Sequence, residues 1–168
     1  FKPRRRLPNL RKADSMLYVM LTILLIVIDQ VVKFLVRANI PLGNSVPFLP
    51  HVLELTYVQN TGAAFSLLAE HTWILTLISV LVVIALWKKV LTHPLGVVPA
   101  VLVLSGGLGN LIDRIAFGYV TDMFRTLFMN FAVFNVADCF VCIGGALWVL
   151  AVLLAERKNK KGQANGGA

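Results

Sequence analysis

Two aspartates in the C-terminal half of the chain have the residue type and spacing that suit chemistry. Asp138 stands at the start of a long apolar run, residues 136–155, and Asp122 precedes it by a short loop. A carboxylate at the edge of such a run is costly unless it has a partner or a function. Two carboxylates held close share one proton, so the ionised one can take a proton from water while the protonated one polarises a carbonyl group. We therefore expect Asp122 and Asp138 to form one acid–base site.

Each candidate also has a structural interpretation. Asn135 suits a helix N-cap, and Asp138 three residues later completes a capping box. Asp122 could be a turn residue, and Asp113 could form a surface ion pair with its neighbour Arg114. The spacing alone therefore leaves open which acidic residues pair.

Other kinds of catalytic site have less support in the sequence. No motif surrounds any histidine (His51, His71 and His93), so we interpret all three as surface residues. Cys139 and Cys142 lie three apart inside an apolar run, where packing is the expected role of a cysteine. Metal ligation by aspartates alone is only weakly indicated. We expect carboxyl acid–base chemistry with no metal and no cofactor.

The composition points to an integral membrane protein. The chain has 168 residues, of which 58% are hydrophobic and 14% are charged, against roughly 25% charged in soluble domains. The net charge of +8 does not indicate nucleic-acid binding, because the basic residues flank apolar runs and are not interleaved with aromatic residues.

Four apolar runs predict four transmembrane helices, at residues 16–36, 72–87, 95–111 and 136–155. No small-residue cleavage site follows the first run at a suitable distance, so we expect it to remain as an uncleaved span. The predicted organisation is a basic cytoplasmic arm, a single membrane domain and a basic, Gly-rich cytoplasmic tail (residues 1–15, 16–155 and 156–168).

Basic residues give the predicted orientation. Twelve of the sixteen Lys and Arg residues lie in three clusters that this topology places on the cytoplasmic side, together with both termini. Polar residues then gather at the outer face: Asn60, Asn110, Asp113, Arg114, Asp122, Asn135 and Asp138. Asp29 lies toward the same side in the first span, where Lys33, four residues later, can pair with it.

The outer segments predict some non-helical structure. Residues 51–58 alternate between apolar and polar types, which predicts a strand. Residues 131–134 are a candidate partner strand, and an Ala-rich segment ending near residue 69 predicts a short surface helix. The fold class is therefore an all-α membrane protein with a small outer sheet.

Five sequence blocks together resemble the signal peptidase II family, the bacterial lipoprotein signal peptidases. They are Asp29-Gln30 with Lys33, Asn60-Thr61-Gly62-Ala63-Ala64-Phe65-Ser66, Gly106-Gly107-Leu108-Gly109-Asn110 with Asp113-Arg114, Val120-Thr121-Asp122, and Phe134-Asn135-Val136-Ala137-Asp138. Any one block is weak evidence, but five in the family's order are specific. Met123 and Cys139 depart from the family pattern, which usually has Phe and often Ser at these positions.

The resemblance implies an aspartic endopeptidase of the bacterial inner membrane with an outward β-cradle. It implies cleavage of prolipoproteins just before a diacylglyceryl-modified cysteine, by a monomer. Asp122 and Asp138 match the catalytic dyad. The residues that match the supporting site are Asp29, Lys33, Asn60, Gly62, Asn110, Asp113, Arg114 and Asn135.

Two other function classes remain as alternatives. A small transporter or proton-relay subunit could use Asp29, Lys33, Asp113 and Arg114, but the inner halves of the predicted spans lack the charges that a conducting path needs. A purely structural membrane protein would leave the outer-face clustering unexplained.

Overall fold

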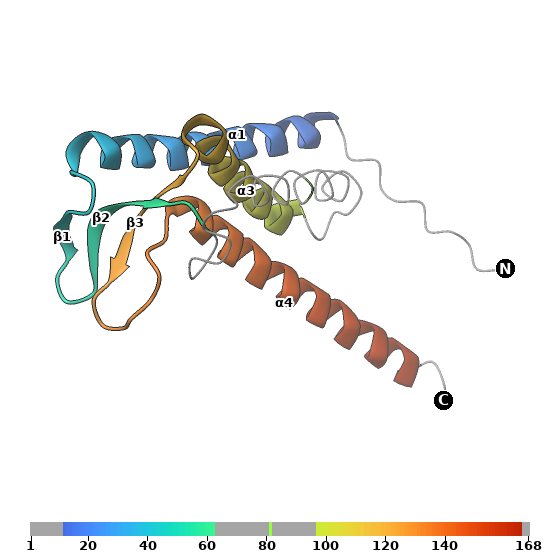
Figure 1. Cartoon of the computed structure of the whole chain (residues 1–168). Coiled ribbons are helices and arrows are strands. Elements are labelled where there is room, and N and C mark those ends of the chain that lie inside the picture. Colours follow the sequence, from blue (N-terminus) through green and yellow to red (C-terminus); the bar gives the residue numbers. More distant parts are fainter. Residues whose placement is uncertain (1–11, 63–80, 82–96, 166–168) are drawn as a thin grey trace.

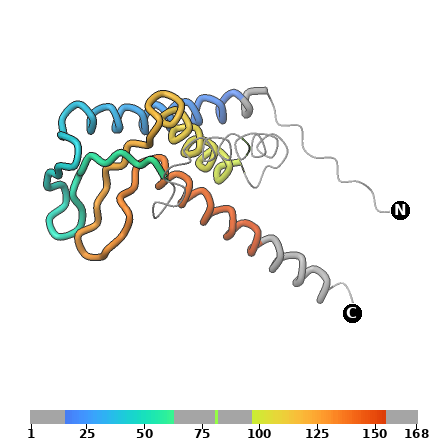
Figure 2. The backbone as a smooth tube through the Cα atoms, in the orientation of Figure 1, coloured from blue at the N-terminus to red at the C-terminus, as the bar shows by residue number. Residues whose placement is uncertain are grey.

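The computed structural model describes residues 12–62, 81 and 97–165. Its elements in chain order are α1 (Lys12–Asn39), β1 (Ser45–Leu49), β2 (Leu53–Asn60), α3 (Val97–Phe117), β3 (Val120–Thr126) and α4 (Val136–Asn165). The three long helices converge at one end of the molecule, where the sheet lies (Figure 1). The start of α1 and the end of α4 lie at the opposite end (Figure 1). The backbone tube shows the same convergence of the helices toward the sheet (Figure 2).

Three helices of the described part are long and apolar enough to cross a membrane. Their apolar segments are Met16–Asn39, Val97–Phe117 and Val136–Leu154. Large apolar side chains such as Leu24, Phe34 and Val149 are more than half exposed on α1 and α4. Exposed side chains of this kind suit a lipid environment. The predicted span at 72–87 and the surface helix ending near residue 69 lie outside the described residues, as do His71 and His93.

The helix α3 extends beyond its predicted end at residue 111. It continues to Phe117, so Asp113 and Arg114 lie within the helix and not in a loop at its end. The helix stops at Gly118, which has a φ of 76° and donates its N–H to the carbonyl oxygen of Arg114 at 3.0 Å. A glycine adopts this left-handed backbone without the strain that a Cβ would cause, which makes it the natural helix stop.

The other two helices are also longer than predicted. The first begins at Lys12 and ends at Asn39, and α4 continues to Asn165 through most of the predicted tail. The apolar runs predicted the membrane-spanning part of each helix, but the polar flanks are also helical because no Pro interrupts them there.

The sheet has three antiparallel strands in the order β1-β2-β3, and α3 lies between β2 and β3 in the chain. The strand predicted at 51–58 is confirmed as β2. The predicted partner at 131–134 is wrong, because β2 pairs with β3, and Phe134 makes only an isolated bridge to Phe124. The first four residues of β3 are buried on both faces, so the strand lacks the alternating pattern that would have revealed it.

A small apolar core attaches the sheet to α1. It consists of Val36, Ile40, Tyr57 and Met123, which are all buried. Val36 lies in α1 and Ile40 directly follows this helix, while Tyr57 and Met123 lie in β2 and β3. The core therefore holds the start of β3 against the C-terminal end of α1. Asp122 precedes Met123 directly, so this core also places Asp122.

Glycines allow α3 and α4 to approach closely. A Cβ built on Gly144 would lie 2.8 Å from the carbonyl oxygen of Pro99 and 2.9 Å from the Cβ of Leu102. A Cβ on Gly106 would meet the carbonyl oxygen of Ala137. Small residues at such positions allow helix packing in membranes.

We expect Gly144→Ala to destabilise the protein, because its methyl group would force α3 and α4 apart. None of the described residues has an atom within 4 Å of the position that a Cβ on the adjacent Gly145 would occupy, so Gly145→Ala is the matched control. Alanine is favoured over glycine in a helix by about 1 kcal/mol, so the control should be neutral or stabilising. Thermal unfolding in detergent should show a lower midpoint for Gly144→Ala only. Equal midpoints would contradict the close packing.

Candidate active site

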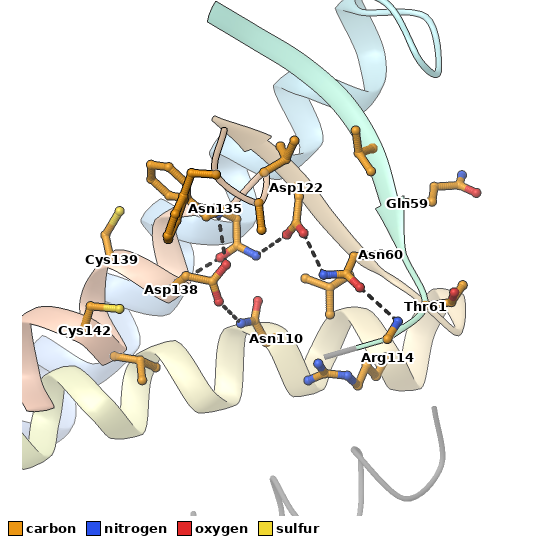
Figure 3. A pocket seen from close by; sticks show the side chains of 18 residues that line it. Gln59, Asn60, Thr61, Asn110, Arg114, Asp122, Asn135, Asp138, Cys139 and Cys142 are labelled. Carbon is orange, nitrogen blue, oxygen red and sulfur yellow. Dashed lines mark hydrogen bonds between the residues drawn. The ribbon is translucent and has the colours of Figure 1, made fainter. Parts of the chain in front are cut away.

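A cavity of about 650 Å³ lies where the ends of the helices meet the sheet. Its lining comes from β2, α3, β3, the segment before α4, and the first turns of α4 (Figure 3). The polar residues that line it are Gln59, Asn60, Thr61, Asn110, Arg114, Asp122, Asn135 and Asp138. The fold therefore brings together side chains from five separate segments of the sequence.

Asp122 enters the cavity from β3 and is only 2% exposed. Its Oδ1 accepts a hydrogen bond from Asn135 Nδ2 at 2.6 Å, and its Oδ2 accepts one from Asn60 Nδ2 at 2.8 Å. Each carboxylate oxygen thus has an amide donor. Asn60 is placed by its own turn, because its Oδ1 accepts the N–H of Gly62 at 2.9 Å. That bond turns the amide nitrogen of Asn60 toward Asp122.

Asp138 lies in the first turn of α4 and forms a capping box with Asn135. The N–H of Asn135 donates to Asp138 Oδ2 at 3.1 Å, and the N–H of Asp138 donates to Asn135 Oδ1 at 2.9 Å. The capping interpretation of these two residues is confirmed. Asp138 Oδ1 also accepts a hydrogen bond from Asn110 Nδ2 at 2.8 Å, so the capping residue also faces the cavity.

Asn135 connects the two carboxyl groups. Its side-chain nitrogen binds Asp122, while its backbone N–H and side-chain oxygen bind Asp138 (Figure 3). Asn135 is fully buried, and these hydrogen bonds hold its side chain in place. One residue therefore both starts α4 and holds Asp122 and Asp138 at the same cavity.

A buried ion cluster lies behind the cavity. Lys33 Nζ is 2.9 Å from Asp29 Oδ2 and 3.2 Å from Asp113 Oδ2, and all three side chains are fully buried. The predicted pairing of Asp29 with Lys33 is confirmed. Lys33 Nζ also donates to Asn110 Oδ1 at 2.9 Å, which turns the amide nitrogen of Asn110 toward Asp138.

The ion cluster also fixes the backbone near both candidate catalytic residues. Asp29 Oδ1 accepts the N–H of Ala137 at 2.9 Å, and Asp113 Oδ2 accepts the N–H of Thr121 at 2.9 Å. These backbone groups immediately precede Asp138 and Asp122. The charges in α1 and α3 therefore set the positions of the two aspartates without contacting them.

Two members of this cluster were not predicted as site residues. Gln30 Nε2 donates to the carbonyl oxygen of Gly109 at 3.0 Å and to Asp113 Oδ1 at 3.1 Å. Arg37 Nη1 donates to Thr121 Oγ1 at 2.8 Å and lies 4.0 Å from Asp113 Oδ1. Arg37 follows Lys33 at the next i+4 position, so helical spacing could have shown that it shares this face.

Arg114 lines the cavity from α3, one helical turn after Asn110. Its buried Nε has no hydrogen-bond partner among the described residues. A buried donor without a partner is costly, so an available acceptor from a bound molecule would be favourable here.

The electrostatics of Asp122 follow from its surroundings. Burial raises the pKa of Asp122 from 3.8 to about 6, and the nearby charge of Asp138 adds to this, while the hydrogen bonds from Asn60 and Asn135 oppose it. The carboxyl group of Asp122 can therefore hold a proton at mildly acidic pH, where most aspartates have lost theirs.

The two cysteines differ from the packing role predicted for them. Cys139 is partly buried, Cys142 is exposed, and both line the cavity. Their apolar neighbours in the sequence suggested packing, but the helix turns this face toward the cavity. His51, by contrast, lies in the exposed turn between β1 and β2, away from the cavity.

Three of the four charged residues that the transporter alternative would use are occupied. Asp29, Lys33 and Asp113 pair with one another in one cluster, and no group of three or more His, Cys, Asp or Glu residues that could hold a metal ion is present in residues 12–62, 81 and 97–165. The arrangement thus favours an acid–base site, formed by a pair of carboxyl groups beside a cavity, over a transport path.

Comparisons with known proteins show which family the chain resembles. The family model described as signal peptidase (SPase) II matches residues 21–154. A lipoprotein signal peptidase of Streptococcus pyogenes serotype M2 (strain MGAS10270) is 43% identical over 144 residues, which are 83% of this chain and 95% of the relative. The corresponding protein of serotype M5 (strain Manfredo) is 42% identical over the same share of each chain.

Two solved structures are also similar. Both are described as bacterial membrane enzyme structures obtained by the in meso method, at 2.3 and 1.9 Å resolution. The first has a TM-score of 0.77 and 31% identity, and the match covers 85% of this chain and 90% of that chain. The second has a TM-score of 0.73 and 30% identity, with 81% and 92% covered.

Proposed function

The chain belongs to the signal peptidase II family, and we propose that it is an aspartic endopeptidase that cleaves prolipoproteins before a diacylglyceryl-modified cysteine. Membership of this family supports the removal of signal peptides from prolipoproteins by a membrane-bound protease. The observation that supports the aspartic mechanism is the pair Asp122 and Asp138, joined through Asn135 at one cavity.

In the proposed reaction, the two aspartates have different roles. Asp138 is the base, because the N-terminal end of α4 favours a negative charge in its first turn. It takes a proton from a water molecule, whose oxygen attacks the scissile carbonyl carbon. Asp122 holds its proton in the buried position and donates a hydrogen bond to the carbonyl oxygen. The C–N bond then breaks, and the proton that Asp138 took from the water molecule goes to the leaving amine.

The supporting residues position these groups. Asn60, Asn110 and Asn135 orient the carboxylates. Gly62 holds the side chain of Asn60, and Lys33 holds that of Asn110. Asp29 and Asp113 hold the backbone N–H groups that precede Asp138 and Asp122. We assign to Arg114 the binding of a substrate carbonyl oxygen, since its Nε is buried without a partner among the described residues. Neither a metal nor a cofactor is required.

We propose a multi-pass arrangement in the bacterial cytoplasmic membrane. Four spans, with the second at 72–87, place both termini in the cytoplasm and the cavity at the outer face. The cavity is lined by residues of β2, β3 and the first turns of α4. Figure 1 shows these segments at the end of the described helices opposite the start of α1, which supports this orientation. The substrate's acyl chains would remain in the lipid, and we propose that the enzyme is a monomer.

A direct test uses the purified full chain in detergent or bilayers with a synthetic precursor peptide. We expect cleavage immediately before a cysteine that carries the diacylglyceryl group, identified by the masses of both products. The same peptide with an unmodified cysteine is the control and should remain intact. Failure of the well-folded protein to cleave the lipidated peptide would contradict the proposed function.

The pKa of Asp122 predicts how cleavage depends on pH. Because the mechanism requires protonated Asp122, and this group loses its proton as the pH rises through about 6, kcat/KM should fall above that pH. Asn60→Ala removes a hydrogen bond that lowers the pKa of Asp122. The falling limb of the profile should therefore move to higher pH in this variant.

The control for this shift is Gln59→Ala. Gln59 is adjacent to Asn60, but its Nε2 donates to the hydroxyl group of Tyr57 at 2.9 Å and not to Asp122. The midpoint of the falling limb should stay where it is in the parent. A shift to lower pH in Asn60→Ala would mean that the limb reports another group.

A further inference from the structure

Two thiols form part of the cavity wall, and the proposed reaction uses neither. Cys139 and Cys142 are the only cysteines in the chain, neither is in a disulfide, and both line the cavity. Figure 3 shows them on α4 next to Asp138. Residues three apart on a helix share a face, with their Cβ atoms about 5–6 Å apart. The two thiols are therefore neighbours at the edge of the candidate active site.

We propose that Cys139 and Cys142 form a dithiol site for thiophilic ligands of the trivalent organoarsenic class, and that its occupation blocks the active site. The binding part of this proposal stands on the cavity geometry alone. The blocking part rests on the proposed function of Asp122 and Asp138.

The helical spacing favours a bridging atom over a direct disulfide bond. A disulfide needs Cβ atoms about 3.5–4.5 Å apart, which is closer than a regular helix places residues three apart. An arsenic atom between the two sulfurs lengthens the bridge, and rotation about the Cα–Cβ bonds brings both sulfurs to it. Thiol sulfur is also a soft ligand that suits soft metals and metalloids.

The proposed bond formation needs no oxidant or reductant. With phenylarsine oxide, two S–As bonds form, and the arsenic–oxygen bond breaks. The oxygen leaves as water together with the two thiol protons, so arsenic remains trivalent. The phenyl ring suits the neighbouring wall, where Phe131, Val133 and Val141 supply apolar surface.

Occupation of this site should interfere with the carboxyl pair. Cys139 follows Asp138 directly, and Cys142 lies one helical turn further along α4. Both thiols border the same cavity as Asp122, so an aryl group attached there occupies space that a substrate would need.

The test treats the purified full-length protein with phenylarsine oxide and removes loosely held reagent with an excess of 2-mercaptoethanol. Intact mass should show one arsenical retained per chain, and 2,3-dimercaptopropanol should release it. Cys139→Ser and Cys142→Ser should retain none, because a single thiol loses the reagent to the monothiol. No retention by the parent, or retention that survives either serine substitution, would overturn the dithiol site.

A second readout tests the blocking effect. Cleavage of the lipidated peptide by the treated parent should fall at least tenfold relative to the untreated parent, and dimercaptopropanol should restore it. Each serine variant is compared with its own untreated sample, and that ratio should stay near one. Full activity with the arsenical bound would overturn the blocking effect. Since the mass measurement needs no cleavage, failure of the proposed function would be recognised separately.

Discussion

Replacing either Asp122 or Asp138 by asparagine is expected to lower kcat for cleavage of the lipidated peptide by on the order of 10³-fold or more. An amide can neither accept the proton of the attacking water nor supply an acidic proton, and such transfers contribute roughly 10²–10⁴-fold. The two carboxyl groups share Asn135, and in the proposed mechanism they act as one unit. The double variant should therefore be about as inactive as each single variant.

The folded structure should survive these substitutions. Asparagine has nearly the shape of aspartate and keeps one oxygen as an acceptor, so each variant loses about one hydrogen bond, worth about 1 kcal/mol. Size-exclusion profiles and thermal midpoints in detergent would verify this. Activity near that of the parent in Asp138→Asn would leave Asp138 with only its capping role.

Glu54→Gln is the matched control for the loss of a carboxylate. Glu54 lies on the same sheet, but it pairs with Arg125 at 2.9 Å and does not line the cavity. Its substitution should leave the cleavage rate within about twofold of the parent, because surface ion pairs contribute only about 0–1 kcal/mol. A large loss of activity in this control would show that carboxylates affect cleavage through the overall charge of the sheet.

Replacement of Lys33 by methionine should cause the largest loss of stability. Methionine has a similar length but no charge, so Asp29 and Asp113 would remain buried close together without their cation. Removal of one partner from a buried ion pair typically costs about 3–5 kcal/mol. For a chain of this size, that corresponds to a fall of on the order of 10 °C in the thermal midpoint.

The same substitution should also lower activity in whatever protein remains folded. Lys33 binds Asn110 Oδ1, and the ion cluster accepts the N–H groups that precede Asp122 and Asp138. Arg125→Met is the control, since Arg125 is a cation on the sheet with a 42% exposed side chain. A change of less than about 1 kcal/mol is expected for it. Equal effects of the two substitutions would contradict the role of the buried cluster.

Several features of the protein followed from local sequence alone. The apolar runs predicted three helices that the structure describes, because the need to cover about 30 Å of hydrocarbon imposes a length that is visible in the sequence. The capping box of Asn135 and Asp138 and the pair Asp29 and Lys33 were also predictable. Each depends on residues three or four apart, so the geometry of one helix decides them.

The partners across the chain required the tertiary structure. The strand pairing of β2 with β3 joins segments that are far apart in the sequence, and burial on both faces hid β3 from the alternating pattern that predicts strands. The two cysteines appeared to be packing residues because their neighbours are apolar, although the helix turns them toward the cavity.

The sequence by itself determined that the chain is a membrane protein and which residue types could do chemistry. It also carried the resemblance to signal peptidase II. Only the folded chain decided that Asn60 and Asn135 both bind Asp122, that Lys33 orients Asn110, and that Asp29 holds the backbone before Asp138. The physical reason is that a hydrogen bond acts over about 3 Å of space, while its two partners here lie as many as 108 residues apart in sequence.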